Sequence, residues 1–393
     1  MNATPAVASP LRSALALALA AAVSLGLARF SYALLLPPMR SDLAWSYTTA
    51  GAMNTVNAAG YLLGALLAPR WLARHDARRV MVAGGVAASV LLAMHALVRA
   101  EGALFILRGA TGWASAASFI GGGLLAARLA GAAGRVGAGT VLGLYYGGTG
   151  LGIVGSALLV PPLVVPAAAW PVAWLALGAV GLAATWITAA GTCELHASAA
   201  APGQRARVPW RSLGFGLAGY LCFGLGYIGY MTFIVTLLRE QGLAAGAVTA
   251  FYVLLGVAVV ASAWLWAGLL QRWHGGGVLA LLNALLALAT LLPVLSRHGT
   301  AAFASGALFG AVFLQVVAAT TALVRHNLPQ AAWPAGITAF TIVFAFGQIV
   351  GPTLVGRIAD GPGGLLRGLA ISAAVLALGA LLASAQRPLR QAA

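Results

Sequence analysis

Twelve long apolar runs constrain the fold of this chain more than any other feature. Each run is about 20 residues long, the length that an α-helix needs to cross the hydrocarbon core of a bilayer. The connections between them are short, so we expect no separate soluble domain. The runs cover residues 13–37, 47–68, 79–98, 102–127, 138–160, 170–191, 212–238, 247–270, 278–295, 300–324, 337–357 and 366–386.

The composition excludes a soluble globule. Apolar residues make up 61% of the chain and charged residues only 7%, against roughly 25% charged in an ordinary soluble domain. Because so few charged side chains cannot cover the apolar surface, lipid must surround most of the protein. We therefore expect an all-α membrane protein with twelve transmembrane helices. The first run exceeds the apolar core of a signal peptide, so we expect it to be retained as a helix.

The distribution of arginine predicts the orientation in the membrane. The net charge is +16, and every basic side chain other than histidine is an arginine. The arginines lie in small groups between apolar runs, which argues against a nucleic-acid partner. Fourteen fall on one side of the twelve runs and six on the other, and the richer side faces the cytoplasm. We expect a multi-pass protein of the bacterial inner membrane with both termini cytoplasmic.

The chain divides into two related halves. The longest polar connection, residues 193–211, separates six runs from six. It predicts an N-terminal bundle over 1–192, a cytoplasmic loop over 193–211 and a C-terminal bundle over 212–393. A shift of 198 residues lays 26–32 (GLARFSY) on 224–230 (GLGYIGY), and a shift of 196 aligns Ile-Val-Gly at 153–155 and 349–351. These matches indicate a duplicated six-helix unit.

Several motifs resemble those of a known family. Gly60-Tyr-Leu-Leu-Gly64 runs into a basic loop, Arg108-Gly-Ala-Thr-Gly112 lies in the fourth run, and residues 26–37 read GLARFSYALLLP. Across the whole chain the sequence resembles the major facilitator superfamily (MFS), and its opening resembles the YbfB/YjiJ-like branch. The resemblance implies two pseudo-symmetric six-helix bundles around a central cavity lined by runs 1, 4, 7 and 10. The cavity would open to each side of the membrane in turn.

The loop between the second and third runs is the candidate gating loop that the resemblance implies. The loop departs from the family pattern because Asp76 is followed by alanine instead of glycine. A role as a charge relay is therefore in question. The gating candidates are Arg70, Arg74, Asp76, Arg78 and Arg79.

Two arginines inside apolar runs are the most informative residues. A charge within a span costs at least about 2.5 to 3.5 kcal/mol on insertion scales, so Arg29 and Arg108 are expected to face a protein interior or a watery cavity. Their positions along the helices place both about 9 to 12 Å below the outer surface. Two guanidinium groups at one level suit a carboxylate or phosphate. The alternative is that either arginine snorkels to headgroups or bonds helix carbonyls.

Polar and aromatic residues near these arginines complete the candidate solute site. Tyrosines one turn away predict aromatic walls, although tyrosines also serve as interface anchors. Amides in mid-span bond either a solute or a neighbouring helix. The substrate-binding candidates are Arg29, Tyr32, Asn57, Arg108, Tyr227, Tyr230, Gln315 and Gln348.

Carboxylates are absent from the middle of every run. All six acidic residues fall in connections or at run ends, which disfavours a cationic-drug antiporter with an acidic cavity wall. The sequence predicts a transporter of a small organic anion that works by alternating access. Multidrug or sugar efflux remains the alternative.

Enzymatic chemistry is disfavoured. The best reactive group, Cys193, Glu194 and His196, is one short local run instead of a cluster drawn from several parts of the sequence. We expect no metal or cofactor, and a functional monomer whose partners are the solute and the lipid bilayer. Patterns such as Gly150-Leu-Gly-Ile-Val-Gly155 match a dinucleotide fingerprint, but inside apolar spans they predict close helix packing.

Overall fold

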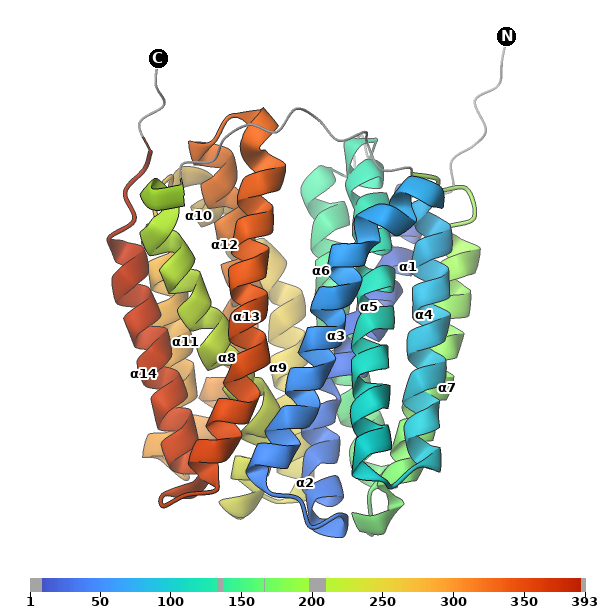
Figure 1. Ribbon diagram of the computed structural model, residues 1–393, viewed down its shortest axis with the longest axis vertical. Helices are drawn as coiled ribbons and strands as arrows, with labels where there is room; N and C mark the ends of the chain where they lie inside the picture. The colour runs from blue at the N-terminus through green and yellow to red at the C-terminus, as the bar shows by residue number, and fades with distance from the viewer. Residues whose placement is uncertain (1–8, 133–136, 166, 198–209, 390–393) are drawn as a thin grey trace.

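The computed structural model describes residues 9–132, 137–165, 167–197 and 210–389, and these residues contain helices and no strand. The long helices run side by side, parallel or antiparallel to one another (Figure 1). The start of α1 and the end of α14 lie at the same end of the molecule, which we call the proximal end; the opposite end is the distal end. The all-α expectation is confirmed.

Each predicted run coincides with an observed helical span, and only the runs 79–98 and 366–386 extend past its end, by one and two residues. The first six spans are α1 (Pro10–Ala21) with a π-helical segment (Ala22–Phe30) and α2 (Tyr32–Asp42), α3 (Tyr47–Arg74), α4 (Ala77–Met94) with a short turn (His95–Leu97), α5 (Glu101–Gly131), α6 (Ala138–Leu163) and α7 (Trp170–Gly191). The last six are α8 (Gly214–Glu240) after a turn (Trp210–Leu213), α9 (Ala245–Leu265) with α10 (Ala267–Arg272), α11 (Gly277–Leu295), α12 (Gly299–Asn327), α13 (Trp333–Ala359) and α14 (Gly364–Ser384).

Length and apolarity support the membrane assignment for nearly all of these spans. Within the described residues, 11 helical spans are long and apolar enough to cross a membrane. The remaining predicted span is α3, whose 28 residues are long enough. Asn54 and Asn57 lower its mean hydropathy, and both are buried in the protein, so these two amides do not meet lipid.

The helices gather into two bundles. Figure 1 shows α1 to α7 on one side and α8 to α14 on the other, and the bundles meet where α3 packs on α13 and α6 on α9. This is the predicted arrangement of two six-helix bundles. Most of the predicted central loop, residues 198–209, lies outside the described residues, so the domain limits drawn from that loop remain a prediction.

Glycines bring the first span close to α6. A Cβ on Gly152 would lie 2.4 Å from the carbonyl oxygen of Ala22, and a Cβ on Gly26 would lie 2.4 Å from the Cα of Gly152. Larger side chains would force the two helices apart. The predicted packing role is thus confirmed for Gly152, whereas it is wrong for Gly155, whose Cβ would meet nothing within 4 Å.

The π-helical segment is the one irregular stretch of the first span. The Ser31 amide donates to the Gly26 carbonyl, five residues back, at 3.0 Å. The hydroxyls of Ser24 and Ser31 each donate to the carbonyl four residues back, at 2.6 and 2.5 Å. Such wide turns are rare and cluster at functional sites. This one carries Arg29.

Candidate functional site

Three of the predicted residues, from both bundles, meet at one point. Arg29 is only 5% exposed, and its Nη2 donates a hydrogen bond to Oε1 of Gln348 on α13. The phenol of Tyr227 on α8 donates to the same oxygen at 2.7 Å. The Arg29 Nε has no hydrogen-bond partner among the described residues. The structure therefore brings Arg29, Tyr227 and Gln348 together and leaves part of the cation's bonding capacity unused.

Aromatic rings surround this point. The guanidinium carbon of Arg29 lies 6.0 Å from the ring centroids of both Phe30 and Tyr61. In the second bundle, Phe223 stacks on Tyr227 with centroids 4.6 Å apart, and Phe344 lies 5.6 Å from Tyr227 with nearly parallel rings. A cation beside aromatic faces is favourable and excludes water from the charge.

Arg108 lies inside the first bundle instead of between the bundles. It is 1% exposed, and its Nη1 donates to the carbonyl of Ala28 at 3.2 Å. Its guanidinium carbon lies 4.7 Å from the ring centroid of Tyr32 and 5.8 Å from that of Trp174. The Nε and Nη2 atoms lack hydrogen-bond partners among the described residues. Arg108 lies at the level of Arg29, since it bonds the backbone of the neighbouring Ala28, but the two side chains have different hydrogen-bond partners among the described residues. Their depth below the outer surface stays a prediction.

The other candidates in the first bundle bond neighbouring helices. The Tyr32 phenol donates to the carbonyl of Ala50 at 2.9 Å. The Asn57 side chain donates to the backbone carbonyl of Arg108 at 3.0 Å. Both contacts fasten the first bundle internally.

The remaining candidates in the second bundle behave in the same way. The hydroxyls of Tyr230 and Ser305 form a hydrogen bond of 2.7 Å, and the Gln315 amide donates to the Ser262 hydroxyl at 3.0 Å. In this conformation the structure does not bring either residue to Arg29.

The gating-loop candidates split into two groups. Asp76 caps α4 by accepting from the amide of Arg78 at 2.9 Å, and it also accepts from the amide of Ala197 at 3.1 Å. The Arg78 guanidinium donates to the carbonyl of Ala189 at 2.7 Å. These bonds stay within the first bundle. Arg70, Arg74 and Arg79 are exposed, so their predicted gating role remains a prediction.

A polar network joins the two bundles at the distal end. Asp360 accepts from the amides of Tyr47 and Thr48 at 2.7 and 2.9 Å and from the Thr48 hydroxyl at 2.6 Å. The Tyr47 phenol donates to Glu240. Arg40 lies 3.7 Å above the Tyr47 ring and 3.9 Å from the Glu240 carboxylate. We call these five residues the distal latch.

The electrostatics of the latch favour an ionised Asp360. Desolvation opposes ionisation, but the hydrogen bonds from Thr48 and Tyr47 outweigh it and lower the pKa of Asp360 below its usual value of 3.8. Backbone contact at this end is also close, because a Cβ on Gly51 would lie 2.2 Å from the carbonyl oxygen of Pro352.

The two ends of the molecule differ. In Figure 1, α3 and α13 meet at the distal end and separate toward the proximal end. Between the latch and Arg29, the Asn54 amide donates to the Thr232 hydroxyl at 2.7 Å, which is another bond between the bundles. On the proximal side Tyr146 of α6 is 47% exposed. Arg29 therefore lies between a closed distal end and a more open proximal end.

The described residues contain no group of three or more His, Cys, Asp or Glu side chains that could hold a metal ion. Cys193 is exposed and Cys222 buried, and both thiols are free.

Three features of the site and of the closed distal end are not marked in the sequence. Tyr61 stands there only within a glycine motif, although its ring flanks the Arg29 cation. The π-helical turn has no sequence signature that we could have used. The latch residues occupy helix ends, where no periodicity marks them, and pair positions about 200 to 300 apart in the chain.

The comparison with protein families gives one match. The family described as "Uncharacterised MFS-type transporter YbfB" matches residues 21–384, which is almost the whole chain. A search of curated protein sequences finds no significant match.

Three solved structures share this fold at low sequence identity. A bacterial homologue of the human lysosomal transporter Spinster, in an inward-facing and unoccupied conformation, is 14% identical with a TM-score of 0.70, covering 96% of this chain and 97% of that one. A variant of the nucleoside transporter NupG is 15% identical with a TM-score of 0.73, covering 95% and 99%. Tetrameric PepTSo2 is 13% identical with a TM-score of 0.70, covering 96% of each chain. At this identity the likeness concerns the fold.

Proposed function

Because this chain belongs to the major facilitator superfamily of membrane transporters, in its YbfB-like family, we propose that it carries a small organic anion through a site between its two bundles. Membership of this family makes the protein a transporter and not an enzyme. The observation that carries the choice of an anion is the buried Arg29 cation at the interface between the bundles.

The surroundings of Arg29 support an anionic solute. The ion pairs of the described residues involve Arg40, Arg99 and His196, and Arg29 is in none of them. Its contacts are the neutral Gln348 and aromatic rings, so its charge is uncompensated. A buried charge without a counter-charge is unfavourable. A carboxylate or phosphate bound to the free edge of the guanidinium would relieve that cost through charge-assisted hydrogen bonds.

The rings nearby suggest the rest of the solute. Tyr61 and Phe30 of the first bundle lie near the cation. Tyr227 of the second bundle bonds the same Gln348 oxygen as Arg29 and stacks with Phe223 and Phe344. A solute with an apolar or planar body attached to its acid group would bury that body against these rings, and area burial would add to the affinity.

Transport then requires that the site open to each side in turn. With both termini in the cytoplasm, as the arginine bias predicts, the closed distal latch faces outward and the open proximal end inward. Release of Asp360 from the start of α3 and closure of the loop over residues 70–79 would give the opposite state. The units that rock would be the bundles over 1–192 and 212–393, and we propose a monomer in a bacterial inner membrane.

Efflux of neutral or cationic lipophilic compounds is the second candidate. The observation that favours it is the run of stacked rings formed by Tyr220, Phe223, Phe344 and Tyr227. Such surfaces bind planar compounds without regard to charge.

A stability screen separates the two candidates. The purified protein is heated with carboxylates, organic phosphates, sugars and lipophilic cations, and the same screen is run on Arg29→Gln and on the exposed control Arg272→Gln. A ligand of the folded state raises the melting temperature. We expect anions alone to stabilise the wild type and Arg272→Gln but not Arg29→Gln. Stabilisation by cations or sugars in all three proteins would contradict the anion assignment and favour efflux.

A further inference from the structure

Two adjoining apolar grooves mark the first bundle, away from Arg29. The first, of about 420 Å³, runs between α3, α4 and α5. The second, of about 430 Å³, continues between α3 and α5 past Leu63. Trp113 lines both grooves and is 41% exposed, and Leu63 is 54% exposed. Exposed apolar residues on a membrane-spanning bundle face lipid, so the grooves open to the bilayer. We call the first one the Trp113 groove.

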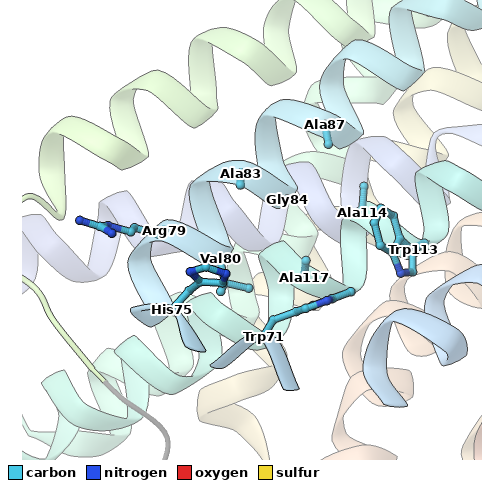
Figure 2. Close-up of a pocket in the computed structure, with 10 residues that line it drawn as sticks. All are labelled: Trp71, His75, Arg79, Val80, Ala83, Gly84, Ala87, Trp113, Ala114 and Ala117. Atoms are coloured by element: carbon cyan, nitrogen blue, oxygen red, sulfur yellow. The ribbon is translucent and has the colours of Figure 1, made fainter. Parts of the chain in front are cut away.

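The Trp113 groove has one charged end and one apolar end. Figure 2 shows Arg79 and His75 at one end, Trp113 at the other, and alanine side chains such as Ala83 between them. Arg79 lies in the first turn of α4, at the proximal end of the molecule. Ala87, eight residues further along α4, lies about 12 Å deeper. That depth approaches half of the roughly 30 Å hydrocarbon core, which is the share of one leaflet.

The charged end is strongly basic. Arg70 and Arg74, in the last turns of α3, are exposed like Arg79 and His75. The only carboxylate in this stretch, Asp76, already accepts backbone hydrogen bonds at the start of α4. Asp76 therefore does not neutralise the basic side chains at the rim. These side chains lie at the end of the membrane-spanning helices, where we expect lipid phosphates.

We propose that the Trp113 groove binds one anionic phospholipid from the leaflet at the proximal end. One acyl chain lies along the apolar wall formed by Trp71 and Trp113, whose rings contact each other edge to face with centroids 5.3 Å apart. The phosphate is held by Arg79 and Arg74. Because the groove faces hydrocarbon, an acyl chain fills it and gains dispersion contacts with its walls that an empty groove would lack. The basic rim selects the headgroup, since each arginine near the surface attracts anionic lipid.

Native mass spectrometry of the full-length protein tests this proposal. The delipidated protein is titrated with phosphatidylglycerol and with phosphatidylcholine of identical acyl chains, and separately with glycerol 3-phosphate as a competitor. The rim is tested with Arg79→Gln and Arg74→Gln, and the groove with Ala83→Phe. Matched controls are Arg272→Gln, an exposed arginine of the second bundle, and Ala179→Phe on exposed α7 surface. Ala87→Leu replaces Ala83→Phe if the latter does not fold.

The proposal expects tighter binding of one phosphatidylglycerol than of phosphatidylcholine. Each rim substitution should weaken phosphatidylglycerol binding about fivefold, filling the groove should abolish it, and both controls should leave it unchanged. Equal binding of the two lipids would overturn the role of the rim. Unchanged binding in the groove-filling variant would overturn the location. Equal loss in Arg272→Gln would show nonspecific charge attraction, and competition by glycerol 3-phosphate would show a site for free phosphate instead of lipid.

Discussion

Removal of the Asp360 carboxylate should release the distal latch. In the Asp360→Ala variant the amides of Tyr47 and Thr48, in the first turn of α3, lose their acceptor across the bundle interface. These amides have no partner within the helix, so in the wild type the carboxylate satisfies them and favours the closed distal end.

The size of the effect follows from the geometry. Replacing a side chain that caps a helix start costs typically ~1 kcal/mol. Although Asp360 accepts three hydrogen bonds, it is exposed at the surface, and solvent screening keeps the loss near that value. A change of ~1 kcal/mol shifts the ratio of distal-closed to distal-open molecules about fivefold toward the open state.

Spin labels at the distal end measure that ratio. Labels on cysteines introduced at Gly102 of α5 and His298 beside α12, with Cys193 and Cys222 replaced, report the distance between the bundles by pulsed electron spin resonance. Asp42→Ala is the matched control, because Asp42 is also a distal carboxylate but bonds Arg99 and Trp170 within its own bundle. An unchanged distance distribution in Asp360→Ala, or an equal shift in Asp42→Ala, would refute the reasoning.

Three further predictions use the same or simpler assays. Gly51→Ala places a Cβ 2.2 Å from the Pro352 oxygen, so it should open the distal end further than Asp360→Ala does, whereas Gly246→Ala, with nothing within 4 Å, should not. Asp360 has a lowered pKa in the closed state, and on opening its pKa returns to the usual value of about 3.8. Its stabilisation of the closed state is therefore complete at pH values above about 3.8. The stabilisation is lost as the pH falls through the lowered value, so acid should populate the open state in the wild type but not in Asp360→Asn. Arg108→Met removes a buried charge with two unpaired nitrogens and should raise the melting temperature; a drop of several degrees would contradict this.

The sequence was sufficient for the fold because membrane helices carry a strong signal. Their length and apolarity are set by the bilayer, and each of the twelve runs matches a helical span to within two residues beyond its ends. The polar α3 is also recognisable, since its asparagines interrupt an apolar run without ending it. The common level of Arg29 and Arg108 also follows from helical rise.

The partners of the candidate site residues could not be predicted in the same way. Which face of a helix meets the interface depends on its rotation, and the π-helical segment that carries Arg29 changes that rotation. Asn57 and Gln315 look equivalent to Gln348 in sequence, yet they bond helices of their own bundle. Tyr47 and Asp360 lie 313 positions apart, so only the assembled fold brings them into contact.

Transport by Arg29 variants tests the central claim most directly. The anion that best stabilises the protein is supplied to proteoliposomes containing the wild type, Arg29→Gln or Arg29→Lys, and uptake is measured by counterflow. Because a hydrogen bond to a charged group contributes about 1.5 to 3 kcal/mol, Arg29→Gln should lose uptake by about tenfold or more, and Arg29→Lys should retain a part of it. Uptake by Arg29→Gln at the same rate as the wild type would contradict the account.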